Sequence, residues 1–214
     1  MENEPLRIDL FADVVCPWCF VGHERLARVL ARTGRAARIT HHPYMLDPHT
    51  PPEGDDIPAR LQRKYGVPPE QLWARLEAEA RKSGLELDLA KQRLSYPTAR
   101  AHTLIRHAEP KGTQDALVRD LYRANFIDAR NINDPGVLAD VAAPHGFAAD
   151  EALRLVTDEE ELAATREVAQ QAAATGIGGV PFFVFGERLA VSGAQPEAVL
   201  EAAIEKAAAV SAAG

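Results

Sequence analysis

Cysteine is scarce in this chain of 214 residues, which has two, three positions apart. A pair so close together cannot join distant parts of a fold, so a framework of structural disulfides is not expected. No stretch approaches the roughly 18 uninterrupted apolar residues of a membrane-spanning helix. Basic residues number 24 against 31 acidic ones, and the formal net charge of -7 does not favour binding to a nucleic-acid backbone. We therefore expect neither membrane nor nucleic-acid partners.

What is present is the composition of an ordinary globular protein, with 46% hydrophobic and 26% charged residues. The length suggests about one to two domains. Residues 1–5 are acidic where a secretory signal would be basic. We therefore expect a cytoplasmic location.

The first part of the chain has the pattern of a β-α-β unit. Alternating apolar and polar residues predict a strand within residues 6–15, and a 3.6-residue apolar repeat after Cys16 predicts a helix that ends near Gly34. A second strand is predicted over residues 37–44.

The middle of the chain, from about residue 54 to residue 176, has no convincing strand pattern and is predicted to be helical throughout. Glycine residues mark the expected helix ends after residues 57–65 and 69–83, and Thr113 is an expected cap. Asp134 before Pro135 is a typical helix start, and the sequence from Thr157 to Glu160 has the pattern of a capping box that would begin a helix reaching residue 175.

Strands return near the C-terminus. Residues 180–185 and 188–191 are predicted strands joined by a two-residue turn, and Pro196 is expected to begin the last helix. The order is therefore β-α-β, a long helical block, and then α-β-β-α.

Both cysteines lie in the motif Cys16-Pro17-Trp18-Cys19, where the first helix is expected to begin. If Cys16 is the N-cap, its sulfur lies where unpaired backbone N–H groups stabilise negative charge, so the thiolate form is favoured and Cys16 becomes the nucleophile. Cys19, one turn along, can then attack a mixed disulfide on Cys16 and release the product. This placement predicts a redox-active dithiol.

Two other interpretations of the cysteine pair were weighed. A zinc site normally needs four ligands, but there is no second cysteine pair, and the adjacent His41 and His42 would point to opposite faces of a strand. A pair that only fills the core is the other alternative. We expect no bound metal and favour redox chemistry.

Further candidates surround the motif. Asp13 is a candidate proton acceptor, although a carboxylate at a strand end is often a solvated turn residue. Trp18 offers a flat apolar surface for substrate. Pro181 lies in a strand-like stretch where it cannot donate a hydrogen bond, and a cis bond there would expose the backbone of Val180 to an extended substrate.

Three stretches together resemble the FrnE-like branch of the DsbA family of thiol-disulfide oxidoreductases, and the resemblance spans nearly the whole chain. They are residues 13–19, which hold the Cys-Pro-Trp-Cys motif, residues 178–183, which hold Gly-Gly-Val-Pro-Phe-Phe, and residues 192–196 before the last helix.

The resemblance implies an α/β thioredoxin-like fold with a large α-helical insertion. The expected thioredoxin-like domain is discontinuous, with residues 1–47 and 157–214, and the insertion is residues 48–156. Cys16 and Cys19 would be catalytic, and Pro17, Trp18, Val180 and Pro181 would bind substrate, with Pro181 in cis. The substrates would be protein or small-molecule disulfides, with no cofactor beyond the Cys16–Cys19 disulfide and with glutathione as a candidate co-substrate.

Departures from the family pattern keep alternatives open. Trp18 stands where the exported oxidant that names the family carries a histidine, so a less oxidising couple is expected. A second hypothesis is a glutathione-dependent isomerase or transferase similar to 2-hydroxychromene-2-carboxylate isomerase and acting in polyketide metabolism, although those relatives generally carry a serine at the position of Cys16. A third hypothesis is a chaperone that binds clients around Trp18.

Overall fold

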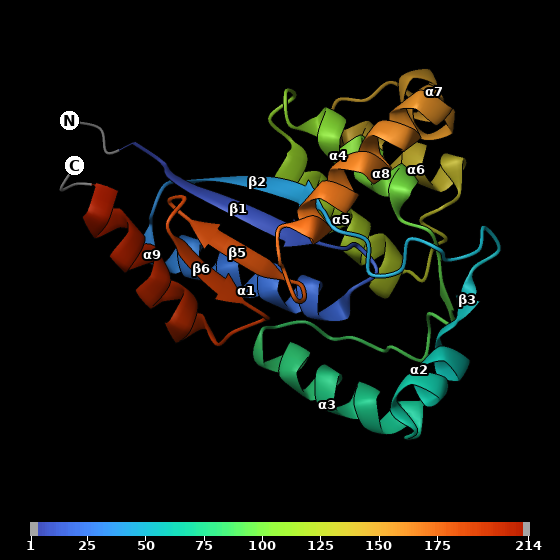
Figure 1. The fold of residues 1–214 in the computed structure, drawn as a ribbon, viewed down its shortest axis with the longest axis horizontal. Helices are drawn as coiled ribbons and strands as arrows, with labels where there is room; N and C mark the ends of the chain where they lie inside the picture. Colours follow the sequence, from blue (N-terminus) through green and yellow to red (C-terminus); the bar gives the residue numbers. More distant parts are fainter. Residues whose placement is uncertain (1–3, 212–214) are drawn as a thin grey trace.

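A computed structural model describes residues 4–211, and its centre is a four-stranded mixed sheet with the order β2-β1-β5-β6 (Figure 1). Strand β1 (Leu6–Ala12) runs parallel to β2 (Ala37–Pro43) and antiparallel to β5 (Phe182–Phe185). Strand β5 also pairs antiparallel with β6 (Leu189–Ser192). The two ends of the chain therefore build one sheet.

The alternation of side chains along β1 explains its central position. Leu6, Ile8 and Leu10 are buried, as the period-2 pattern predicts. In the register with β5, Ile8 lies opposite Phe185 and Leu10 opposite Phe183. The predicted β-α-β start and the C-terminal hairpin are confirmed.

Helices α1 (Pro17–Thr33) and α9 (Glu197–Ser211) pack against each other beside the sheet. Arg32 of α1 forms ion pairs with Glu197 and Glu201 of α9, and Arg28 of α1 also binds Glu197. Helix α1 therefore connects the sheet to the C-terminal helix.

The remaining helices form two groups around the sheet (Figure 1). One group is the pair α2 (Ile57–Tyr65) and α3 (Pro69–Lys82), of which α3 packs against α1. The larger group includes α8, which contacts β2. Its members are α4 (Ala99–Ala108), α5 (Gln114–Phe126), α6 (Pro135–Ala142), the 3-10 helix η1 (Ala143–His145), α7 (Ala149–Thr157) and α8 (Glu159–Ala174).

Three details of the sequence prediction are wrong. The middle also holds two short strands, β3 (Asp55–Asp56) and β4 (Leu94–Ser95), which are too short to show a period of two. Asp158, not Thr157, caps α8, with its carboxylate accepting from the N–H of Glu160. The hairpin loop has three residues, because Phe185 pairs with Leu189.

The thioredoxin-like fold with a helical insertion is the architecture observed. The domain boundaries at residues 47/48 and 156/157 stay a prediction. Within residues 4–211 no helix is long and apolar enough to cross a bilayer.

Candidate active site

Cys16 is the N-cap of α1, as predicted. Its φ of -93° and ψ of 110° are extended, and Pro17 follows in the first turn of the helix. The Cys16 carbonyl accepts hydrogen bonds from the N–H of Cys19 at 3.0 Å and of Phe20 at 3.2 Å. The sulfur of Cys16 thus stands at the positive end of the helix dipole, where a thiolate is stabilised.

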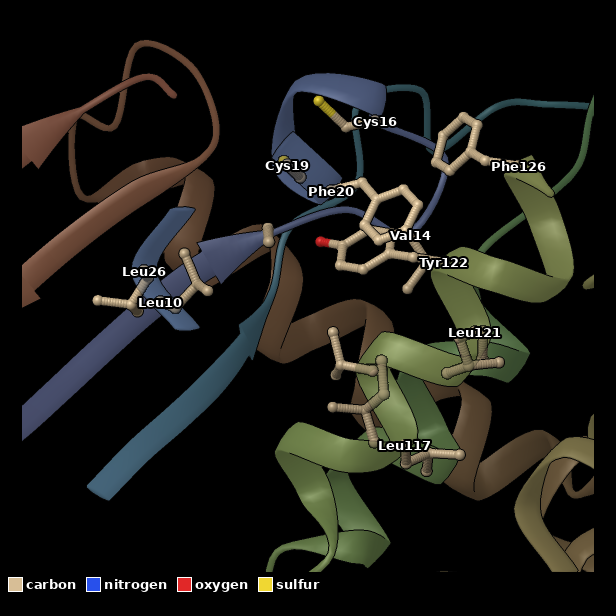
Figure 2. Packing of buried hydrophobic residues seen from close by; sticks show 14 of the residues in the cluster. Leu10, Val14, Cys16, Cys19, Phe20, Leu26, Leu117, Leu121, Tyr122 and Phe126 are labelled. Carbon is tan, nitrogen blue, oxygen red and sulfur yellow. The ribbon is translucent and has the colours of Figure 1, made fainter. Parts of the chain in front are cut away.

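The two cysteines are free thiols one helical turn apart, and their side chains interact electrostatically. Figure 2 shows Cys16 at the first turn of α1 and Cys19 further inside, near Phe20. Cys16 is 5% exposed and Cys19 is fully buried. Burial raises the pKa of the Cys19 thiol well above its ordinary value, and the hydrogen bond and charge of Cys16 raise it further. A backbone hydrogen bond from Asp13 to Cys19 opposes this rise.

The loop before β5 lies against the dithiol. The Val180–Pro181 peptide bond is cis, and the Val180 carbonyl oxygen is 3.9 Å from the Cys16 Sγ. Val180 is partly exposed, whereas Pro181 is buried and packs close to Gly22 of α1. Two segments 164 positions apart in sequence therefore meet at the sulfur of Cys16.

Pro17 and Trp18 are both partly exposed, and Trp18 also packs against the hydrophobic core. Together with Val180 they leave accessible surface next to a sulfur that is itself nearly covered. The predicted substrate-binding residues are thus brought together, while the role assigned to them stays a prediction.

Asp13 is 1% exposed, so it is not a solvated turn residue. One carboxylate oxygen accepts the backbone N–H of Leu46 at 2.8 Å, and the other lies 3.3 Å from the Nε2 of His102. Its backbone carbonyl accepts the N–H of Cys16 at 3.0 Å. Asp13 therefore links the dithiol loop to α4 through His102, for which the sequence did not predict a contact with Asp13.

Histidine 41 belongs to a cluster that the sequence did not reveal. The Nε2 atoms of His23 on α1 and His41 on β2 each lie 2.8 Å from the same Oδ1 of Asp115 on α5. His42 points to the other face of the strand, as expected, and binds Asp9. The cluster therefore joins α1, β2 and α5, one turn of α1 beyond Cys19.

The cluster is strongly biased toward an ionised Asp115 carboxylate and a neutral His41 imidazole. Burial raises the pKa of Asp115, but the hydrogen bonds from His23 and His41 outweigh it and lower that pKa far below its ordinary value. Burial lowers the pKa of His41, and the opposing hydrogen bond from Asp115 does not offset this.

Comparison with known proteins agrees with the geometry. The family model of the DSBA-like thioredoxin domain matches residues 7–205. A probable DsbA oxidoreductase from Streptomyces coelicolor is 33% identical, with a TM-score of 0.83 over 94% of this chain and 89% of that chain. Among curated protein sequences, none matches closely enough to count as a relative.

Two more distant structures share the fold alone. A 2-hydroxychromene-2-carboxylate isomerase is 17% identical, with a TM-score of 0.71 over 96% of this chain and 98% of that one. The cytosolic disulfide reductase DsbM from Pseudomonas aeruginosa with GSH is 19% identical, with a TM-score of 0.62 over 97% of this chain and 98% of that one. The match to the family model and the Streptomyces structure decide the assignment: this chain belongs to the DsbA family of thioredoxin-fold proteins.

Proposed function

We propose that this chain is a thiol-disulfide oxidoreductase that exchanges disulfides through Cys16 and Cys19. The observation that carries the proposal is the placement of Cys16 at the N-cap of α1, with a free Cys19 one turn along the same helix. Cys16 keeps a small exposed surface and Cys19 has none, so a substrate can reach Cys16 first and Cys19 is left to resolve the mixed disulfide.

The reduction of a substrate disulfide would proceed in two steps. The Cys16 thiolate attacks one substrate sulfur, forming a mixed disulfide and releasing the other sulfur as a thiolate that takes up a proton. Cys19 then loses its proton and attacks the Cys16 sulfur, which releases the second substrate thiol and leaves a Cys16–Cys19 disulfide. Two electrons pass from the dithiol to the substrate, and the reverse sequence oxidises a substrate dithiol.

Because the pKa of Cys19 is raised, its deprotonation requires a nearby proton acceptor. Asp13 is our candidate proton acceptor, since it interacts electrostatically with Cys19 and its carboxylate is anchored by Leu46 and His102. In this proposal the Asp13–His102 pair takes up the proton as Cys19 attacks.

Substrate would bind across Pro17, Trp18, Val180 and Pro181. The Val180 backbone is next to the Cys16 sulfur and can pair with an extended peptide, while the partly exposed Trp18 ring offers an apolar surface to the residue beside the substrate disulfide. These contacts suit protein disulfides as well as small ones.

Reduction of insulin disulfides tests the proposal. Cys16→Ser should abolish the activity, because the attacking sulfur is lost. Cys19→Ser should keep the attack and accumulate a mixed disulfide on Cys16, which mass spectrometry of the trapped protein would detect. Activity retained by Cys16→Ser at the wild-type rate would exclude this function.

The isomerase alternative rests on a structural likeness at 17% identity, which concerns the fold. The intact Cys16–Cys19 pair favours disulfide exchange, because isomerisation would not use the second thiol. Both proposals allow glutathione as a co-substrate, and the proposal includes a cytoplasmic location and placement in the FrnE-like branch. Glutathione-dependent isomerisation of 2-hydroxychromene-2-carboxylate by the Cys16→Ser, Cys19→Ser double variant would support the isomerase instead.

A further inference from the structure

Three side chains from three elements converge one helical turn beyond Cys19. They are His23 of α1, His41 of β2 and Asp115 of α5, and one potential ligand atom from each lies within 4.8 Å of the others. The two imidazoles are almost fully buried, with side chains 1% and 4% exposed, whereas the Asp115 side chain is 37% exposed. The cluster is thus closed on the protein side and open toward solvent on the carboxylate side.

We propose that this cluster binds a divalent transition-metal ion of the zinc type. The ligands would be the Nε2 atoms of His23 and His41 and the Oδ1 of Asp115, with water in the fourth position. Two imidazoles and a carboxylate form a ligand set that zinc takes up when one coordination position stays open.

The spacing of the ligand atoms is close to what a tetrahedral ion needs. Bonds of about 2.0–2.1 Å place neighbouring ligand atoms roughly 3.3 Å apart. Both Nε2 atoms lie 2.8 Å from the Asp115 Oδ1, so an outward shift of about half an ångström would open the site. Such a shift is within reach of side-chain rotation.

The cluster also has an opening. The Asp115 side chain is 37% exposed, which gives an ion a route to the two buried imidazoles.

A second, independent observation concerns the other nitrogen of each ring. Among the described residues, the Nδ1 atoms of His23 and His41 are buried and have no hydrogen-bond partner. Buried polar atoms of this kind are rare, and a bound water is one accepted explanation for them. When Nε2 binds a metal, the imidazole proton moves to Nδ1. For His41, a cavity of about 10 Å³ that His41 and Tyr122 line has room for about one water that could accept this proton.

The competing explanation is an ion-free cluster, in which each imidazole simply donates its Nε2–H to Asp115 and the three elements are tied together. The two explanations differ in one measurable property, which is the affinity of the folded chain for zinc. Since thiols also bind zinc, the experiment uses the full chain with Cys16→Ser and Cys19→Ser, and its result does not depend on the proposed disulfide exchange.

Equilibrium dialysis of this double-serine chain against micromolar zinc, followed by metal analysis, should give one zinc per chain. Thermal unfolding should shift upward by about 5 °C with excess zinc. Adding His41→Gln should weaken zinc binding at least tenfold and remove the shift. The matched control is His42→Gln, the next residue on the same strand but on its other face, which should keep both.

Asp115→Asn provides a second variant, because the amide oxygen still accepts hydrogen bonds from both imidazoles while the carboxylate ligand is lost. It should fold and bind zinc at least tenfold more weakly, and cobalt should lose its visible absorption bands in parallel. No stoichiometric zinc in the double-serine chain, or the same loss of binding in His42→Gln as in His41→Gln, would overturn the proposal in favour of the ion-free cluster.

Discussion

Cys19 has no exposed surface, and burial is the main reason that the pKa of its thiol is raised. Removal of the partner thiol in Cys16→Ser leaves that main cause in place. We predict that iodoacetamide alkylates Cys19 of folded Cys16→Ser at pH 8 at least about tenfold more slowly than in the unfolded chain, since only the thiolate reacts. The rate in the folded chain should still rise above pH 9. Mass spectrometry between pH 7 and pH 10 measures both rates.

The control for this prediction is the same variant in concentrated urea, where the thiol titrates as in a free peptide. Equal rates in the folded and unfolded chain at pH 8 would mean that neither burial nor the raised pKa protects Cys19. Cys19 could then react before Cys16, which contradicts its proposed role as the resolving thiol.

Gly22 sits where α1 passes closest to the loop that carries Pro181. A β-carbon added at position 22 would lie 2.8 Å from the Cγ of Pro181 and 3.2 Å from the Cζ of Phe183. We predict that Gly22→Ala destabilises the fold by about 1–2 kcal/mol, because overpacking outweighs the higher helix propensity of alanine. It should also slow disulfide exchange, because Pro181 must move. Urea unfolding and insulin reduction measure the two effects.

The matched control is Gly178→Ala, in the same loop but with nothing within 4 Å of an added β-carbon. It should change stability by less than about 0.5 kcal/mol. A Gly22→Ala variant that is more stable than the wild type would show that the loop yields to the methyl group without cost.

At the level of elements, Arg25 joins three parts of the chain. Its guanidinium donates to the Ser83 Oγ at 2.9 Å, to the Ala194 carbonyl at 2.7 Å and to the Glu79 carboxylate at 3.0 Å. The Arg25 side chain is 7% exposed. One buried cation therefore fixes α3 and the segment before α9 onto α1, the helix that carries the dithiol.

We predict that Arg25→Met lowers the free energy of unfolding by about 3 kcal/mol, because the buried Ser83 hydroxyl and the partly buried Ala194 carbonyl lose their donor while the apolar stem is kept. Arg25→Lys should recover little, since one ammonium cannot point in three fixed directions. Arg28→Met, on the same helix but in an exposed ion pair with Glu197, should cost about 0.5 kcal/mol. Urea unfolding compares the three, and a similar loss in Arg25→Met and Arg28→Met would contradict the argument.

The elements that the sequence predicts well are those whose own residues determine their ends. The helix Ile57–Tyr65 is predicted to the residue, because Gly66 closes it with a φ of 68°. Thr157 and Asp158 are both good caps, and only the structure shows that the Thr157 hydroxyl bonds back to the Leu153 carbonyl at the end of α7. Strands of two residues carry no periodic signal at all.

The same distinction holds for the site. The N-cap position of Cys16 follows from the adjacent proline and the helical pattern, so local sequence suffices. Asp13 contacts His102, which is 89 positions away in the sequence. Asp115 likewise contacts His23, which is 92 positions away. Contacts between residues so far apart cannot be predicted from a single sequence.

Across the whole molecule, ionised carboxylates hold helices and strands together at several places. Hydrogen bonds from a cation or a backbone N–H lower the pKa of four of them, which are Glu197, Glu79, Asp56 and Glu151. For Glu197 the main cause is the hydrogen bond from Arg32 at 2.6 Å, and Arg28 adds a second one at 2.8 Å.

A lowered pKa in the folded state means that the unfolded chain binds more protons as the pH falls below about 4.5. The stability from these four carboxylates is therefore complete above about pH 4.5 and is lost as the pH falls through their folded pKa values. We predict that the urea midpoint declines steadily below pH 4.5, and that Glu197→Gln makes this decline shallower while costing about 0.5 kcal/mol at pH 7. Glu205→Gln, an exposed residue of the same helix, is the control. If Glu197→Gln and the wild type lose stability in parallel below pH 4.5, the contact between α1 and α9 does not contribute to acid sensitivity.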